Sequence, residues 1–226
     1  MIGQAVLAIW FGIDPAGLED FDRWYARQHL PERLSVPGFL RGRRYAAVGE
    51  GPPFFTLYEL DDGSVATSAA YLERLNHPTD WTRRVLPTFR HMLRNPYRRL
   101  AASPGDRWAR HLATVRITPA AGHEPAVRRA HEGEALAALA RQPGVVGAAT
   151  YESDTGGGAV QTEERKLIGG AVQAATPFLA LLELADSGGA AAVGEFWRAW
   201  GGRLAADVTV DVYRLLYGLS WLRPEA

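Results

Sequence analysis

PGFLRGRRYAAV at residues 37–48 and PGVVGAATYESD at residues 143–154 share a layout that decides how the chain folds. Both segments place Pro-Gly eight residues before a tyrosine, Tyr45 in the first copy and Tyr151 in the second. Two more pairs of segments match in the same order: FFTLYELDDGS (54–64) with FLALLELADSGG (178–189), and YRRLAA (97–102) with YRLLYG (213–218). Three matches in one order predict an internal duplication.

Each half is predicted to follow the order β-α-β-β-α-β. Strands are expected at 4–13, 39–48, 54–60 and 97–103, with helices at 18–33 and about 64–94. In the second half, strands are expected near 111–118, 145–153, 178–184 and 210–219, with helices near 124–141 and 188–206. This ferredoxin-like unit has helices on one face of its sheet, so the other face must be covered. The predicted fold class is therefore α+β, with duplicated ferredoxin-like units, 1–105 and 106–226, forming a pseudo-dimeric α+β barrel.

Composition limits the function classes. The 226 residues are 47% apolar with zero formal net charge, which argues against nucleic-acid binding. There is no cysteine, so disulfides and thiolate chemistry are excluded. The sequence has no uninterrupted apolar run of about 20 residues, so no membrane span is expected. The N-terminal segment is expected to be a strand and not a signal peptide. A cytoplasmic protein with no membrane partner is the expectation.

The first half carries a resemblance to a known family. The run WYARQHLPERLSVPGFLRGRRY (24–45) and YEL (58–60) resemble the EthD-like branch of the dimeric α+β barrel superfamily. That resemblance implies an aromatic residue, a histidine near the end of the first helix, and an Arg-Tyr strand. The superfamily includes cofactor-free monooxygenases, isomerases, cyclases, haem enzymes and proteins of unknown role, so the resemblance implies the fold more strongly than any function.

His29 is the first candidate catalytic residue. Its unperturbed pKa near 6.5 suits a general acid or base. The alternative is a structural role, because a protonated histidine stabilises a helix C-terminus by roughly 0.3–1 kcal/mol. The second half has no counterpart, since Ala135 stands at the same distance from its Pro-Gly.

The strand at 39–48 is expected to present Arg43 and Tyr45 to the barrel interior, because alternate residues of a strand share a face. The residues predicted on that face are Phe39, Arg41, Arg43, Tyr45 and Ala47, and those on the helix-covered face are Leu40, Gly42, Ala46 and Val48. Trp10 and Arg116 are expected on the interior face of their own strands. A few polar groups in an apolar cavity are typical of a small-molecule site. The alternative is that Arg43 pairs with a carboxylate from the other half and Tyr45 is a core residue.

Two segments after residue 75 carry further candidates. NHPTDW (76–81) separates two helical pieces, with His77 as a second catalytic or substrate-binding group and Trp81 as a wall, or else a simple turn. RRVLPTFRHMLRNPYRR (83–99) holds six arginines and no acidic residue. These arginines could attract an anion, although a solvated helix face is the more common explanation.

No histidine spacing or glycine-rich loop indicates a metal or nucleotide site, so no cofactor is expected. A haem remains an alternative through the family resemblance. The segment 154–176 is rich in glycine and interrupts the second hairpin, so it is predicted to be a mobile loop, a lid or a contact arm.

The favoured function is cofactor-independent proton transfer on an aromatic or carbonyl compound inside the barrel, as in an isomerase, cyclase or lyase. His29 and Tyr45 are the candidate catalytic residues. The candidate substrate-binding residues are Arg43, Trp10, Tyr58, His77, Trp81 and Arg116. A non-catalytic ligand-binding or stress-related barrel is the alternative class, and the oligomeric state is left open.

Overall fold

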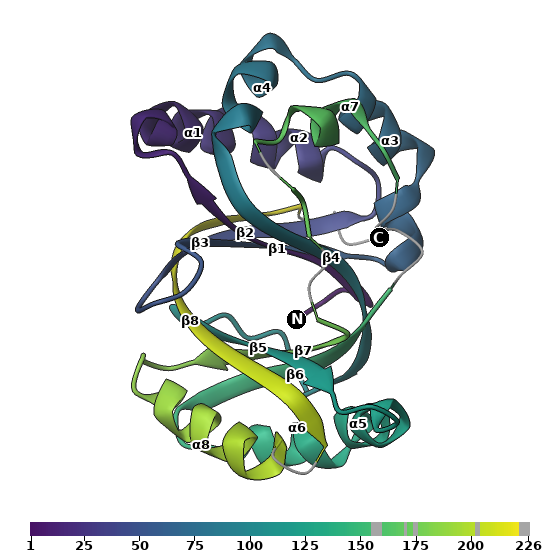
Figure 1. Ribbon diagram of the computed structural model, residues 1–226, viewed down its shortest axis with the longest axis vertical. Coiled ribbons are helices and arrows are strands. Elements are labelled where there is room, and N and C mark those ends of the chain that lie inside the picture. The colour runs from purple at the N-terminus through teal and green to yellow at the C-terminus, as the bar shows by residue number, and fades with distance from the viewer. Residues whose placement is uncertain (155–159, 170, 174–175, 202–203, 222–226) are drawn as a thin grey trace.

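Eight antiparallel strands close into one barrel in the computed structural model, which describes residues 1–154, 160–169, 171–173, 176–201 and 204–221. The strands are β1 (Ala5–Ile13), β2 (Phe39–Ala47), β3 (Phe54–Leu60), β4 (Phe89–Ala102), β5 (His111–Pro119), β6 (Val145–Ser153), β7 (Phe178–Leu184) and β8 (Ala205–Ser220). Their order around the barrel is β1-β3-β2-β8-β5-β7-β6-β4. Figure 1 shows the barrel between two layers of helices, one at each end of the long axis.

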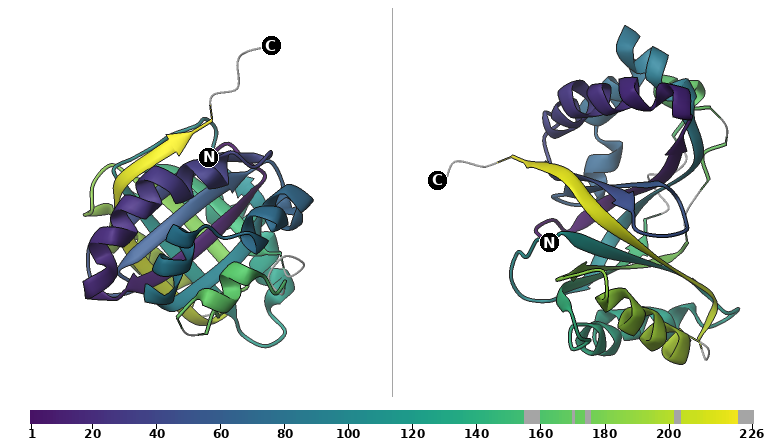
Figure 2. Two further views of the ribbon diagram at one scale, coloured as in Figure 1. Left: turned by 90° about the horizontal axis from the view of Figure 1, so that it is seen from above. Right: turned by 90° about the vertical axis from the view of Figure 1, so that its left-hand side faces the viewer.

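The two halves have the same strand order, which confirms the predicted duplication. The first half runs β4-β1-β3-β2 and the second runs β8-β5-β7-β6. The halves join at two antiparallel seams, β2 with β8 and β4 with β6. The long strand β8, yellow in Figure 2, forms one of these seams. The chain is therefore a pseudo-dimeric α+β barrel, as the sequence predicts.

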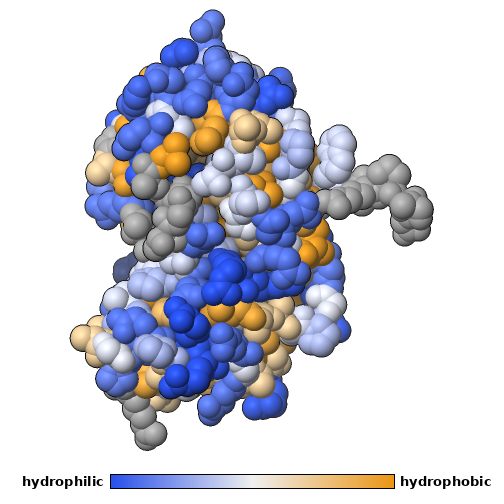
Figure 3. Space-filling model, turned by 90° about the vertical axis from the view of Figure 1, so that its right-hand side faces the viewer, coloured by the Kyte–Doolittle hydropathy of each residue, from blue (hydrophilic) through white to orange (hydrophobic). Residues whose placement is uncertain are grey.

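The helices lie outside the barrel. Those over the first half are α1 (Leu18–Trp24), α2 (Leu30–Leu34), α3 (Ala69–Asn76), α4 (Asp80–Val85) and α7 (Glu163–Leu167), and those over the second are α5 (Glu124–Glu132), α6 (Glu134–Leu139) and α8 (Gly189–Gly201). Hydroxyl side chains cap three of the short helices: Ser68 accepts from the backbone N–H of Tyr71, Thr79 from that of Thr82, and Thr162 from that of Arg165. Seen from the side of α3 and α5, the surface is mostly hydrophilic with scattered hydrophobic residues (Figure 3).

The turns before β2 and β6 explain why both halves place a Pro-Gly pair at the same distance from the tyrosine of the following strand. Gly38 has a φ of 91° and Gly144 a φ of 78°, a backbone conformation that favours glycine. Each glycine therefore ends the helical layer and returns the chain into the sheet at the same point of its half.

The barrel interior is a packed core. Its buried apolar and aromatic residues come from both halves: Val6, Ala8, Trp10, Tyr45, Phe55, Leu57, Tyr97, Leu112, Ala149, Tyr151, Leu179, Leu181 and Tyr213. At one level the guanidinium of Arg43 bonds Glu183 at 2.5 Å and Glu59 at 3.2 Å. These glutamates occupy equivalent positions of β7 and β3, so Arg43 pairs with a carboxylate from each half, and Arg41 is a second partner of Glu59 at 3.2 Å. The alternative explanation of Arg43 as an ion-pair residue therefore describes the structure.

Three expectations about elements need correction. The helix expected to about residue 94 ends much earlier, and β4 already begins at Phe89 because this segment pairs with β1. Tertiary pairing overrides the ambiguous local pattern there. Phe39 lies under the helices, because a register shift between Phe39 and Arg41 reverses its face. The arginines of 83–99 do not share a helix face.

Part of the glycine-rich segment 154–176 crosses to the other half. Of the described residues, α7 packs beside α3 of the first half, and the backbone N–H of Glu163 bonds the side chain of Asn76 at 3.2 Å. Further on, the backbone N–H of Gln173 donates to Met92 at 2.9 Å and its carbonyl accepts from Arg94 at 3.0 Å. The prediction of greater mobility concerns residues that in part lie outside the described ones and stays a prediction.

Candidate functional site

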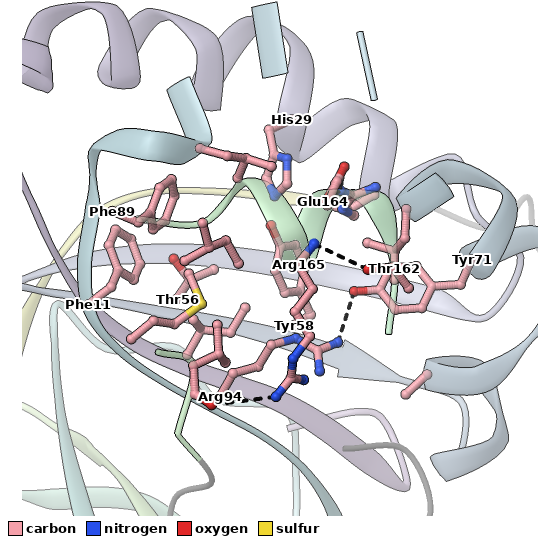
Figure 4. Close-up of a pocket in the computed structure, with 18 of the residues that line it drawn as sticks. Phe11, His29, Thr56, Tyr58, Tyr71, Phe89, Arg94, Thr162, Glu164 and Arg165 are labelled. Carbon is pink, nitrogen blue, oxygen red and sulfur yellow. Dashed lines mark hydrogen bonds and ion pairs between the residues drawn. The ribbon is translucent and has the colours of Figure 1, made fainter. Parts of the chain in front are cut away.

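A pocket lies between the helices of the first half and the outer face of its sheet, with α7 and the residues after it as one wall (Figure 4). Its cavity volume is about 80 Å³. One buried water needs roughly 10–15 Å³, so the space is enough for a small molecule and not only for a single water. The sequence predicts a site in the barrel interior, whereas this pocket lies on the opposite, outer face of the first sheet.

An irregular helix positions two of the pocket residues. Between α1 and α2 the chain forms a π-helical turn, Tyr25–His29, and Pro31 follows two residues later. Proline has no N–H to donate, and its ring clashes with the carbonyl four residues earlier, so regular α-helix is disfavoured at this point. Such π turns are frequent at functional sites, and this one brings both Tyr25 and His29 to the pocket.

The His29 ring extends from the helical layer toward the cavity (Figure 4). It packs on the Trp24 ring at a centroid distance of 4.2 Å and near Tyr25 at 5.2 Å. Its Nδ1 is buried without a hydrogen-bond partner among the described residues. Burial lowers the pKa of His29 well below its usual value, and the charge of Arg33 lowers it further. His29 is therefore neutral at pH 7.

Two tyrosines on facing elements share a hydrogen bond inside the pocket. The hydroxyls of Tyr25 and Tyr58 lie 2.6 Å apart. Burial raises the pKa of both phenols far above the usual value, so both stay protonated. The pair uses one O–H for its own bond, which leaves the second hydroxyl proton for another acceptor.

The wall supplied by α7 is fixed by a buried ion pair. Nη2 of Arg33, at the end of α2, lies 2.5 Å from both carboxylate oxygens of Glu164. The side chains of Arg33 and Glu164 are only 2% and 9% exposed. Burial raises the pKa of Glu164, opposed by the attraction of Arg33. Nη1 of Arg33 is buried and has no partner in the described part of the chain.

A second arginine lines the pocket from the sheet. Arg94 of β4 donates from Nη2 to the hydroxyl of Tyr71 at 3.2 Å. The Tyr71 ring also lies beside Arg33, whose guanidinium carbon is 5.6 Å from its centroid. Figure 4 shows Phe11 and Phe89 at one end of the pocket and Tyr71, Arg94, Glu164 and Arg165 at the other. The pocket has an apolar end and a charged end.

Of the residues singled out from the sequence, the structure brings together only His29 and Tyr58. The other strand residues point into the barrel interior, away from the pocket. Trp10 donates to the hydroxyl of Thr114 at 3.3 Å, Arg116 pairs with Asp211 at 2.9 Å, and Tyr45 is fully buried in the interior cluster. Face alternation is thus right for Arg43 and Tyr45, but the interior face is filled by side chains. The roles assigned to these residues stay predictions.

His77 and Trp81 lie on the outer layer. His77 follows α3, is exposed, and pairs with Glu73 at 3.1 Å. Trp81 is half-buried on α4 and donates from Nε1 to Asp20 at 2.9 Å. Neither residue lines the pocket. The contact from this layer to the pocket comes from Thr82, the residue after Trp81. Its hydroxyl accepts a hydrogen bond from Nε1 of the buried Trp24 at 3.1 Å and so fixes the wall behind His29.

Sequence reasoning missed Tyr25, Arg33, Tyr71 and Glu164, and it noted Arg94 only as one of the six arginines of 83–99 that could attract an anion. Tyr25 lies four residues before His29, a helical spacing that could have indicated a shared face. Arg94 lies two residues after Met92 on one face of β4, a signal hidden by the wrong helix prediction. Glu164 gave no signal, because its contact with Arg33 spans 131 residues.

The pocket does not fit a haem. A cavity of about 80 Å³ is far smaller than a tetrapyrrole, and α7 closes one side through the Arg33–Glu164 pair. Within the described ranges, no three His, Asp or Glu side chains are placed to hold a metal ion. No helix among the described residues is long and apolar enough to cross a membrane.

Comparison with known proteins supports the fold. No family model matches the chain, and no curated protein matches it in sequence. An anthrone oxidase-like protein superposes with a TM-score of 0.60 at 11% identity, covering 96% of this chain and 92% of its own. A candidate monooxygenase from Fusobacterium nucleatum gives 0.58 at 9%, covering 97% and 96%. A mutant chlorite dismutase from Candidatus Nitrospira defluvii, crystallised with cyanide, gives 0.54 at 12%, covering 95% and 92%. The chain has the fold of the dimeric α+β barrel superfamily.

Proposed function

We propose that the first-half pocket binds a small aromatic or carbonyl-bearing molecule and that His29 transfers a proton on it. The observation that carries this proposal is the state of His29, which is neutral, reaches the cavity, and has a buried Nδ1 with no partner in the described part of the chain. A neutral imidazole is able to accept a proton, and a buried nitrogen without a partner is costly unless a ligand contacts it.

The chemistry is that of a carbon acid. His29 takes a proton from a carbon next to a carbonyl group, and the electron pair of the broken C–H bond moves onto the carbonyl oxygen. A hydroxyl of the Tyr25–Tyr58 pair donates to that oxygen and stabilises its charge. Return of the proton to a different carbon completes an isomerisation, so no cofactor is required.

A direct test is exchange of carbon-bound hydrogen for deuterium in D₂O, followed by NMR over a panel of small aromatic ketones and lactones. His29→Ala is expected to slow the exchange by about 10²-fold, the usual scale for losing a general base. The rate in the wild type should fall as pH drops below the lowered pKa of His29. Binding of panel compounds with no exchange at any pH would reject catalysis and favour a ligand-binding barrel.

A matched pair of variants distinguishes the pocket from the barrel interior. Tyr58→Phe removes a hydroxyl from the pocket, whereas Tyr45→Phe removes one from the interior cluster. The proposal expects Tyr58→Phe to slow exchange more than Tyr45→Phe does. The reverse order would return the site to the barrel interior.

Oxygenation is a second candidate, because a carbanion made by the same proton removal is able to react with O₂. Fold neighbours described as a candidate monooxygenase and an anthrone oxidase-like protein favour it. Oxygen consumption that accompanies the loss of the substrate, and that depends on His29, would select this candidate over isomerisation.

A further inference from the structure

The charged end of the pocket contains an unused donor. Arg33 is 2% exposed, and its Nη2 already contacts both oxygens of Glu164. Its Nη1 is buried and has no hydrogen-bond partner among the residues that the structure describes, while the residue lines the pocket. A buried guanidinium N–H without an acceptor is unfavourable, so this geometry points to an acceptor that is supplied from outside the chain.

Arg94 lies close to the same point. Tyr71 contacts both arginines, since its ring lies beside Arg33 and its hydroxyl accepts from Arg94. Both guanidinium charges also act on the Glu164 carboxylate, which places them within one electrostatic neighbourhood.

Hydrogen bonding at this end of the pocket leaves one donor over. Arg33 and Arg94 line it together with the carboxylate of Glu164, and Glu32, which acts on both Arg33 and Glu164, is the next acidic neighbour. Both oxygens of Glu164 contact Nη2 of Arg33, so among the described residues Nη1 of Arg33 is the donor that remains for an anionic group on a ligand.

We infer that the ligand is an aromatic carboxylate, whose carboxylate binds Nη1 of Arg33 and the guanidinium of Arg94 while its ring lies against Phe11 and Phe89. The inference rests on the proposed function, for which it names the substrate class. The planar fork of arginine matches a carboxylate, and the apolar end of the pocket matches an aromatic body (Figure 4). The small cavity volume favours one ring over a larger framework.

The placement also connects binding to chemistry. The charge of Arg33 lowers the basicity of His29. A carboxylate on Arg33 offsets that charge, so the bound ligand makes His29 a stronger base than it is in the empty pocket.

Benzoate and benzamide test the inference, because they have nearly the same shape and differ in charge. Calorimetry on the full chain at pH 7 should show benzoate binding tighter by roughly tenfold to hundredfold, the scale of a charge-assisted hydrogen bond. Arg94→Gln should reduce this ratio to about threefold or less. Arg98→Gln is the matched control, because Arg98 lies on the same strand and pairs with Glu152 outside the pocket. It should keep the wild-type ratio.

The outcomes separate the two proposals. Benzamide binding as tightly as benzoate, with both shifting the His29 ring signals in NMR, would overturn the carboxylate and leave the proposed function intact. If neither compound shifts those signals, both proposals fail. A benzoate preference that survives Arg94→Gln but is lost in Arg98→Gln would place the anion elsewhere and overturn the inference. Circular dichroism of each variant checks that it is folded.

Discussion

Under the helices of the second half, His131 packs against Phe178 and Trp197 at centroid distances of 5.3 and 5.5 Å. Under the helices of the first half, the equivalent space holds the pocket. Strand registers show where the halves differ: Thr56, Tyr58 and Arg94 correspond to Ala180, Leu182 and Val210. One copy of the duplicated unit has polar residues around a cavity, and the other has aliphatic residues against an aromatic cluster. The two copies of the unit therefore differ in packing, with a cavity under the helices of the first half and a filled space under those of the second.

The largest effect is expected from opening the filled half. Trp197 is fully buried, and Trp197→Ala should lower the free energy of unfolding by about 3–5 kcal/mol, because it removes a large side chain and leaves a cavity. Leu75→Ala, at a half-buried wall of the pocket, should cost roughly 1 kcal/mol or less. Urea denaturation measures both. Equal costs would show that the two helix layers are packed alike.

The next largest effect is expected in the pH dependence of stability, through the buried His131 of the second half. Burial lowers the pKa of His131 to about 4. Between about pH 4 and 6.5 the unfolded chain binds a proton there that the folded chain does not, so stability rises with pH and is lost on acidification. The change is roughly 3 kcal/mol at most for this residue. His131→Phe should remove that share of the slope. An unchanged slope would mean that folding does not lower the pKa of His131.

A smaller effect should come from the tyrosine pair that only the first half has. Tyr58→Phe leaves the Tyr25 hydroxyl without its partner at 2.6 Å, and the free energy of unfolding should fall by about 1 kcal/mol. The Tyr25→Phe/Tyr58→Phe double variant should be more stable than the sum of the single losses predicts, with a coupling of roughly 0.5–1.5 kcal/mol. Strict additivity in this double-mutant cycle would mean that the two hydroxyls do not interact.

The smallest effect concerns the wall supplied by α7. A Cβ at Gly169 would clash with the carbonyl oxygen of Pro87, so Gly169→Ala must displace this segment. Global stability should change by less than about 1 kcal/mol, while amide exchange at Gln173 becomes faster. Gly133→Ala is the control, since nothing lies within 4 Å of its Cβ position. Unchanged exchange in Gly169→Ala would show that the wall tolerates the displacement.

The repeats at Pro37 and Pro143 were enough to predict the fold, because each turn requires a glycine with positive φ and each strand then alternates in the same way. The site was harder to predict from the sequence than the fold. Strand alternation correctly turned Arg43 inward, but a face pattern does not show whether the interior is empty or filled. The pocket depends on the π turn before Pro31 and on a contact between Arg33 and Glu164, and neither follows from local spacing.

The contact between Arg33 and Glu164 also sets an order of events during synthesis. A ribosome that adds 5–20 residues per second needs roughly 7–26 s to cover the 131 residues between them. Throughout that interval, the nascent first half carries Arg33 and the apolar end of the pocket without the wall that later covers them. Truncation after β4 would therefore release a sheet with an unfinished pocket and two unpaired edges, because the last lining residue is Val172 and the pocket is complete only after about three quarters of the 226 residues have been made.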